Sequence, residues 1–306
     1  GDAVELASMR ALWENVNWTA GQCAIGSVKS NIGHLLTGAG AASMIKTLLG
    51  FRRQTLPPAI HFRAPLPDSP LQDGPFRVQT EAAPWPARQP GRPVRAAVSS
   101  FGFGGINAHM LLEQWLPDAD PGVVPYAAAA GQTSPAVSAD TRPPEVAVVG
   151  MEAVFGRAAG LRAFQESLLR GEQLLKKRGP DRWRGGETIA REFLDADIER
   201  GAFIDEVAVR VGEFHIPPNE IDQILCQHLL ILKAMARAMT DAGLSIGEKR
   251  VDTGVVVGMD FDVAANDYHF RWNLSNAVAH WETDFGLALP ETGRAAWIGQ
   301  VKEAWS

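Results

Sequence analysis

Residues 29–34 read Lys-Ser-Asn-Ile-Gly-His, and Leu-Leu-Thr-Gly-Ala-Gly-Ala-Ala-Ser follows directly at residues 35–43. A cation, an amide and an imidazole thus lie close together, just before a run of small residues that can form a tightly packed helix. This order indicates a catalytic loop beside a helix N-terminus, where the helix dipole disfavours an imidazolium. We therefore expect His34 to stay neutral and to act as a hydrogen-bond donor. A buried histidine with a solvated lysine nearby is the alternative.

A second stretch, residues 99–109, reads Ser-Ser-Phe-Gly-Phe-Gly-Gly-Ile-Asn-Ala-His. It lies between apolar segments at 94–98 and 110–112, which are expected to form strands over 94–99 and 107–114. Its three glycines allow positive φ and a close approach of the backbone to a ligand. Taken alone, the stretch could also be a tight hairpin with aromatic packing.

Together the two stretches resemble the C-terminal half of a β-ketoacyl synthase of the thiolase superfamily, in which both loops occur in this order and at this separation. Residues 1–5, 56–62 and 75–78 also match segments of that family. The resemblance covers residues 1–116 and implies an α/β fold of the layered αβαβα thiolase type. Ile106 departs from the family, which usually has threonine at this position, and so removes a hydroxyl from the loop.

The resemblance also implies roles for individual residues. In the family, a cysteine carries the acyl chain, and two histidines stabilise the enolate that forms when a malonyl thioester loses CO₂. His34 corresponds to the second histidine, and Lys29 to the lysine that supports the site electrostatically. The nucleophilic cysteine and the first histidine are expected upstream of Gly1. The expected substrate-binding residues are Asn31, Phe103, Gly104, Gly105 and Asn107, with Phe103 as a gating side chain.

The composition changes after residue 116. Residues 117–144 contain Asp-Pro-Gly, four consecutive alanines and several prolines without any periodic pattern, which predicts a linker. Residues 145–306 resemble the N-terminal half of a second ketosynthase. The chain is therefore expected to hold two incomplete ketosynthase-type halves, 1–116 and 145–306, joined by this linker.

Four elements are expected in the second half. Apolar runs at 146–151 and 255–257 predict buried strands, and periodic apolar residues predict helices at 161–170 and 220–242. Cys226 would then lie inside the long helix as a small packing residue, and Cys23 is expected to pack in the same way.

The long helix departs from that of an active ketosynthase, because Leu-Cys-Gln-His at 225–228 stands where the family usually has Asp-Pro-Gln-Gln. Residues 216–223, 257–260 and 268–274 instead resemble the chain-length-factor domain of polyunsaturated-fatty-acid-type synthases. Two alternatives stay open: a junction between two catalytic ketosynthases of a modular polyketide synthase, and a non-catalytic module that shapes the acyl tunnel.

The composition limits which partners, compartments and metal sites are possible. The chain has 306 residues and a net charge of −6 without a basic run, which argues against nucleic acid as a partner. Two cysteines exclude a disulfide framework and favour a reducing cytoplasm, and no apolar stretch is long enough for a membrane span. The seven histidines and two cysteines form no zinc set by spacing. Because the chain starts inside a motif, we expect it to be an internal piece of a longer polypeptide.

The resemblance finally implies the partners. These are an acyl carrier protein whose phosphopantetheine arm carries the substrate, acyl and malonyl thioesters, and a second ketosynthase-like subunit or domain as pseudo-dimer partner. No directly bound cofactor and no metal are expected.

Overall fold

The computed structural model describes residues 2–67, 69–102, 105–117, 146–179, 200–204, 206–221, 224–258, 274, 278–286 and 290–304. The chain divides into two compact units. The first comprises Gly1–Lys176, Ala202–Ile204 and Arg237–Leu244, and the second comprises the remaining segments. The first unit contains the catalytic loop expected from the sequence.

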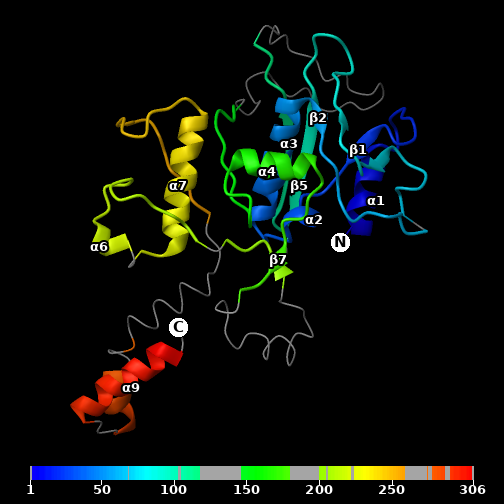
Figure 1. The fold of residues 1–306 in the computed structure, drawn as a ribbon. Coiled ribbons are helices and arrows are strands. Elements are labelled where there is room, and N and C mark those ends of the chain that lie inside the picture. The colour runs from blue at the N-terminus through cyan, green and yellow to red at the C-terminus, as the bar shows by residue number, and fades with distance from the viewer. Residues whose placement is uncertain are drawn as a thin grey trace. The chain divides into compact units, whose positions relative to one another are not determined.

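The helices and strands of residues 1–116 follow the predicted pattern closely (Figure 1). The expected strands at 94–99 and 107–114 are confirmed. Apolar spacing and turn residues in the sequence also predict helices at 3–14 and 38–50 and strands at 23–28 and 76–80, and these are confirmed too, although several are shorter than expected. The helices are α1 (Asp2–Leu12), α2 (Lys29–Ile32) and α3 (Gly38–Arg53). The strands are β1 (Cys23–Ile25), β2 (Thr55–Leu56), β3 (Phe76–Val78), β4 (Ala83–Pro84), β5 (Arg95–Phe101) and β6 (Asn107–Glu113).

These strands associate in pairs. β1 pairs with β3 in parallel, whereas β2 with β4 and β5 with β6 are antiparallel. Helix α3 packs against β5, and the approach is so close that a Cβ atom on Gly40 would lie 2.8 Å from the Ser100 hydroxyl oxygen. Since β5 leads into the glycine-rich loop and α3 begins four residues after His34, this contact links the two motifs that the sequence singled out.

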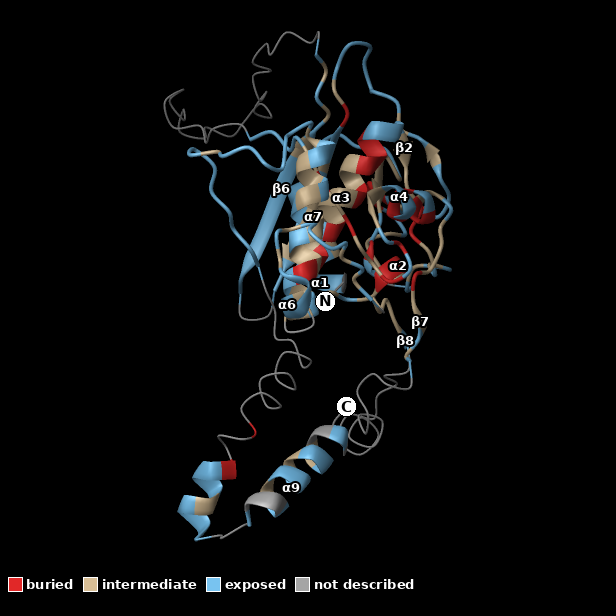
Figure 2. Cartoon of the chain, turned by 60° about the vertical axis from the view of Figure 1, so that its left-hand side comes forward, coloured by how far each residue is buried: buried red, intermediate tan, exposed pale blue. Residues whose placement is uncertain are grey.

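Helix α4 (Leu161–Leu169) lies beside α3 and supplies buried apolar side chains to the same core (Figure 1). The core is therefore shared between residues on both sides of the predicted linker, and Figure 2 shows buried positions on α2, α3 and α4. Each large aliphatic or aromatic side chain buried there contributes about 1.5–3 kcal/mol. The core residues are Val28, Ile32, Ala42, Leu49, Met151, Ala153, Ala158, Phe164, Leu168 and Leu174.

The two buried strands predicted in the second half are wrong. Residues 146–149 and 255–257 are not in strands, and Val146 and Val256 are 87% and 98% exposed. A strand needs a neighbour that accepts and donates its backbone hydrogen bonds, and the described residues pair neither run with one. Only Met151, at the end of the first run, reaches the core.

The long helix predicted at 220–242 is instead two helices, α6 (Pro218–Ile221) and α7 (Cys226–Asp241). The carbonyl of Leu225 accepts the amides of His228 and Leu229, so α7 starts there. Cys226 is consequently the first residue of α7 and is exposed, which contradicts the predicted packing role in mid-helix. Because the apolar period continues across the break, periodicity could not reveal it.

The predicted helix at 161–170 is confirmed by α4. Other described elements include β7 (Lys176–Lys177), β8 (Arg200–Gly201) and α9 (Glu291–Ala304). Within the described part of the chain, no helix has both the length and the apolar character needed to cross a membrane.

Candidate active site

His34 is exposed in the turn between α2 and α3, and its Nδ1 atom accepts a hydrogen bond of 3.1 Å from the backbone amide of Leu36. When Nδ1 accepts, the ring proton of a neutral imidazole resides on Nε2. Leu36 has a φ of 47°, which is uncommon for a residue with a side chain. The turn thus holds His34 in the tautomer that the predicted donor role requires.

Lys29 is the first residue of α2, and its side chain is exposed. Its amide donates to the Ser27 hydroxyl at 3.2 Å, and its carbonyl accepts the Gly33 amide at 2.8 Å. Gly33 has a φ of 83°, a conformation that glycine adopts without steric cost. This sharp end of α2 leads directly to His34, so Lys29 and His34 are separated by one short helix and one turn.

Asn31 lies inside the protein, with an exposed fraction of 0%. Its side-chain amide donates to the Glu172 carbonyl at 3.0 Å, and its own backbone carbonyl accepts the Leu174 amide at 2.8 Å. The structure therefore places Asn31 against a segment from the far side of the predicted linker. Its substrate-binding role stays a prediction.

The glycine-rich loop is described in part, and Phe103 and Gly104 lie outside the described residues. Gly105 has a φ of 86°, and the Gly102 amide donates to the Ile106 carbonyl at 2.8 Å to close the turn between β5 and β6. Gly105 and Asn107 are both exposed. The turn forms with isoleucine at 106, and the substrate-binding and gating roles of this loop stay predictions.

Sequence reasoning missed Lys46, which is 7% exposed on α3. Its Nζ donates to the carbonyls of Ser27 at 3.2 Å and Pro58 at 2.8 Å, and burial lowers its pKa to about 8. Because Ser27 precedes α2 by two residues, the ammonium ties the start of the catalytic loop to the segment that follows β2. The sequence did contain a signal for this buried lysine, because Lys46 lies between Ile45 and Leu49 on the apolar face of a helix.

Sequence reasoning also missed Asp241 at the end of α7. Its carboxylate accepts two hydrogen bonds from Arg52, at 2.9 and 3.2 Å, and one from the Met151 amide at 3.0 Å. The bond from Arg52 holds the pKa of Asp241 below its usual range. A bidentate pair of this kind fixes both direction and distance, so it joins α3 to the end of α7. The Met151 amide adds the start of the second half to this contact.

The two cysteines lie in different surroundings. Burial raises the pKa of Cys23, and Arg88 and Arg77 offset that rise only in part, so its thiol stays protonated near neutral pH. Cys226 is exposed on α7, away from any strand-to-helix turn of the described residues. Among the described residues, no three His, Cys, Asp or Glu side chains are grouped so that they could hold a metal ion.

Family comparisons match three stretches of the chain. Residues 1–63 match the C-terminal domain of beta-ketoacyl synthases, residues 65–141 match the ketoacyl-synthetase C-terminal extension, and residues 144–288 match the N-terminal domain of beta-ketoacyl synthases. The chain therefore belongs to the β-ketoacyl synthase family, with C-terminal-domain sequence preceding N-terminal-domain sequence. The α/β thiolase-like fold class predicted from the two motifs is that of this family.

Similar proteins are large synthases. The chain is 34% identical over 288 residues to a polyunsaturated fatty acid synthase protein of Thraustochytrium sp., a match that covers 91% of this chain and 13% of that protein. It is 45% identical over 116 residues to a phenolphthiocerol/phthiocerol polyketide synthase protein of Mycobacterium tuberculosis, covering 37% of this chain and 8% of that protein.

Among solved structures, the ketosynthase from module 6 of the bacillaene synthase of Bacillus subtilis 168 is 41% identical, with a TM-score of 0.37. The match covers 38% of this chain and 21% of that one. The chain thus spans a small fraction of the length of each relative that it matches.

Proposed function

We propose that this chain is part of a multidomain fatty-acid or polyketide synthase that catalyses decarboxylative Claisen condensation. An acyl thioester on the enzyme is extended with malonyl carried by an acyl carrier protein. The observation that carries the proposal is the hydrogen bond from the Leu36 amide to Nδ1 of His34, which makes Nε2 the donor. The family matches and the synthases that this chain resembles support it.

In the proposed reaction, the bond between the malonyl carboxylate and its α-carbon breaks, and CO₂ leaves. The electron pair stays on the α-carbon and is delocalised onto the thioester oxygen as an enolate. Nε2–H of His34 donates to that oxygen, and the Lys29 ammonium adds positive charge. The enolate carbon then attacks the acyl thioester carbonyl, and the cysteine thiolate leaves with the second electron pair. The cysteine and the first histidine are the residues expected upstream of Gly1 in the whole protein.

The proposed partners follow from this reaction. The phosphopantetheine arm of the acyl carrier protein brings malonyl to the site, and no other cofactor takes part. A second ketosynthase-like subunit or domain serves as pseudo-dimer partner, and the synthase works in the cytoplasm as an acyltransferase.

We further propose that residues 145–306 begin a chain-length factor that does not catalyse condensation. The support is the sequence Leu-Cys-Gln-His at 225–228, where active ketosynthases usually have Asp-Pro-Gln-Gln, together with the resemblance of residues 216–223, 257–260 and 268–274 to chain-length-factor domains. The rival is a junction between two catalytic ketosynthases. Acylation of a cysteine at the nucleophile position of the second domain, detected by mass spectrometry of the whole synthase, would favour the rival.

The deciding experiment measures two steps separately in the whole synthase. His34→Ala is expected to slow CO₂ release from malonyl thioester by roughly a hundred- to a thousandfold, because one oxyanion donor is lost. Acyl loading of the cysteine, followed by mass spectrometry, should change little. His228→Ala is the matched control, since His228 is an exposed histidine on α7, outside the loop. An equal loss of both steps in a folded His34→Ala protein would show that His34 is misassigned.

A further inference from the structure

We propose that Ile106 determines substrate specificity, because its side chain contacts the acyl chain and favours chains without oxygen on carbon 3. The proposal rests on the proposed function, since that function assigns substrate binding to the glycine-rich loop. It names the substrate class of that site, which is a hydrocarbon chain of the fatty-acid type. Condensation leaves a keto oxygen on carbon 3 of its product, so carbon 3 is where the acyl chains in such a synthase differ.

The turn that carries Ile106 is closed by its backbone. The Gly102 amide donates to the Ile106 carbonyl at 2.8 Å, and Phe101 pairs with Asn107 where β5 ends and β6 begins. Gly105 adopts the positive φ of the turn, 86°. Among these described contacts, residue 106 contributes its carbonyl oxygen alone. The turn therefore does not depend on the side chain at 106, which is free for another role.

Isoleucine differs from the threonine that the family usually has at position 106 only in what the side chain presents. Both residues are branched at Cβ and share the same backbone preferences. Threonine offers a hydroxyl that donates and accepts hydrogen bonds, whereas isoleucine offers hydrocarbon alone. An oxygen on the acyl chain would lose its water contacts against isoleucine without gaining a new partner. A plain hydrocarbon chain would instead bury apolar surface there.

The side chain of Ile106 is 80% exposed, and the glycines of the turn leave space beside it. A Cβ atom on Gly105 would meet no described atom within 4 Å, and one on Gly102 would lie 3.9 Å from the Ile106 Cβ. A ligand can therefore approach the turn closely next to Ile106. Single exposed apolar side chains are common on protein surfaces, so the place of Ile106 in the fold decides its meaning.

Helix α3 connects this turn to the His34 loop. A Cβ atom on Gly40 would lie 2.8 Å from the Ser100 hydroxyl oxygen, so the first turn of α3 packs one residue before the end of β5. The same helix begins four residues after His34. The turn that carries Ile106 and the loop that carries His34 therefore both lie where α3 begins.

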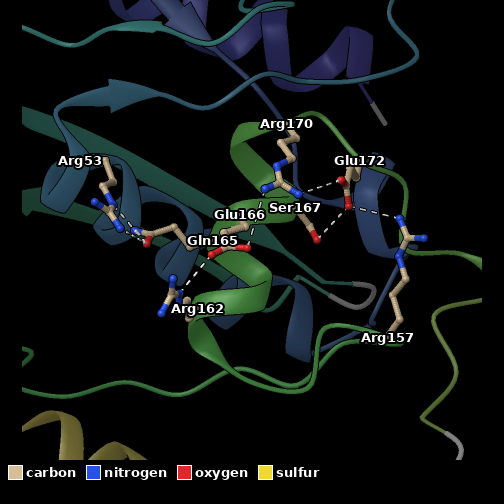
Figure 3. Close-up of polar contacts among 8 residues, drawn as sticks. All are labelled: Arg53, Arg157, Arg162, Gln165, Glu166, Ser167, Arg170 and Glu172. Carbon is tan, nitrogen blue, oxygen red and sulfur yellow. Dashed lines mark hydrogen bonds and ion pairs between the residues drawn. The ribbon is translucent and has the colours of Figure 1, made fainter.

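The helix that supports this turn is itself held in place. Near the other end of α3, Nε and Nη2 of Arg53 each donate to Oε1 of Gln165 on α4 at 3.2 Å, as Figure 3 shows. Gln165 is only 8% exposed, so these bonds form largely out of water, where they are stronger. A turn on a fixed support presents the Ile106 side chain in a set position, as a specificity determinant requires.

The test measures acyl loading of the cysteine in the whole synthase, because this step does not use the enolate donor His34. The probes are the hexanoyl and 3-hydroxyhexanoyl thioesters of N-acetylcysteamine, and mass spectrometry of the acylated cysteine gives a loading rate constant for each. The wild type should load the hexanoyl probe faster. Ile106→Thr should shift the ratio of the two rate constants about tenfold toward the hydroxylated probe, which is the discrimination that one apolar contact provides.

Two variants control for shape and for location. Ile106→Val separates the hydroxyl from the change of shape, because valine and threonine have the same shape and differ in the hydroxyl. It should keep the preference of the wild type. Leu111→Thr introduces the same hydroxyl on β6, at a residue that is 79% exposed and outside the turn. It should leave the ratio of the two rate constants unchanged.

The outcomes distinguish this inference from the proposed function. A ratio that shifts in Ile106→Thr alone supports the role of Ile106. Normal loading with an unchanged ratio in Ile106→Thr overturns that role and leaves the proposed function standing, and so does an equal shift in Ile106→Thr and Ile106→Val. A wild type that prefers the hydroxylated probe also overturns the role of Ile106. If neither probe acylates a cysteine of the synthase, the proposed function fails and this inference fails with it.

Discussion

Residues 146–149 read Val-Ala-Val-Val and are rich in strand-forming side chains, whereas β5 and β6 contain few of them, yet only β5 and β6 form strands. Every residue of β5 pairs with a residue of β6, from Arg95 with Glu113 to Phe101 with Asn107. The apolar run at 146–149 has no such neighbour among the described residues, and Val146 is 87% exposed. The difference teaches that strand propensity is realised only where the chain supplies a pairing edge. Helices need no partner for their backbone, and α3 and α4 form as expected.

The strongest test of this comparison shortens one side chain in the shared core and one side chain in an unpaired apolar run. Phe164 is 0% exposed and its ring lies 4.7 Å from that of Phe155, whereas Val256 is 98% exposed. Phe164→Ala is expected to lower the free energy of unfolding by about 3–5 kcal/mol, and Val256→Ala by less than about 0.5 kcal/mol. Urea denaturation followed by circular dichroism measures the free energy of unfolding of both variants. Similar losses of stability in the two variants would contradict the difference between the core and the exposed run.

The next effect concerns Lys46. Burial lowers the pKa of its side chain from 10.5 to about 8. Between these values the unfolded chain binds more protons than the folded one, so the free energy of unfolding should rise with pH across this window. A shift of this size corresponds to about 3 kcal/mol. Lys46→Met removes the titrating group and should remove that rise. Denaturation curves of both proteins at about pH 7.5 and about pH 10 test this expectation. If the free energy of unfolding rises equally in the wild type and in Lys46→Met, the rise comes from other titrating groups.

A smaller effect is expected at Gly150, where the exposed run meets the core. A Cβ atom there would lie 2.2 Å from the Ala238 carbonyl oxygen and 2.8 Å from the Ala242 Cβ. Gly150→Ala should therefore cost about 1–3 kcal/mol of stability through overpacking. Gly254→Ala is the control, because a Cβ atom there meets nothing within 4 Å. Thermal unfolding compares the two, and equal midpoints would mean that the contact is not formed in solution.

The two cysteines provide the mildest test. Cys226 is exposed, whereas Cys23 is half-buried with a raised pKa. Iodoacetamide near neutral pH should therefore label Cys226 several times faster than Cys23, as peptide mass spectrometry would show. Cys226→Ser should leave condensation by the whole synthase unchanged. An acyl group found on Cys226 would contradict the chain-length-factor proposal.

The sequence of residues 1–116 was sufficient to predict most of its helices and strands, because the motifs at 29–34 and 99–109 fix the family and the family fixes the order of elements. The local signals were also strong, as at α3, whose small residues pack closely on β5. The hydrogen bond from Asn31 to Glu172, the buried position of Lys46 and the Asp241–Arg52 pair could not be predicted, since each depends on a tertiary contact that leaves no periodic pattern.

The second half was predicted less well for the same physical reason. The helix at 161–169 has an apolar face that packs on the core, and its prediction succeeded. Whether the apolar runs at 146–149 and 255–257 form strands depends on neighbouring segments, and so does the break before Cys226. The amino-acid composition carries no information about those neighbours. Phe103 and Gly104, which the family resemblance marks for the substrate site, lie outside the described residues.

The separation along the chain between Asn31 and Glu172 has a consequence for synthesis. The two residues are 141 positions apart. At about 5–20 residues per second, the ribosome needs roughly 7–28 s to make the intervening segment. During that interval neither Leu174 nor Phe164 is available to pack against α2 and α3. The hydrogen bonds between Asn31 and residues 172–174 therefore form only after residue 174 has left the ribosome.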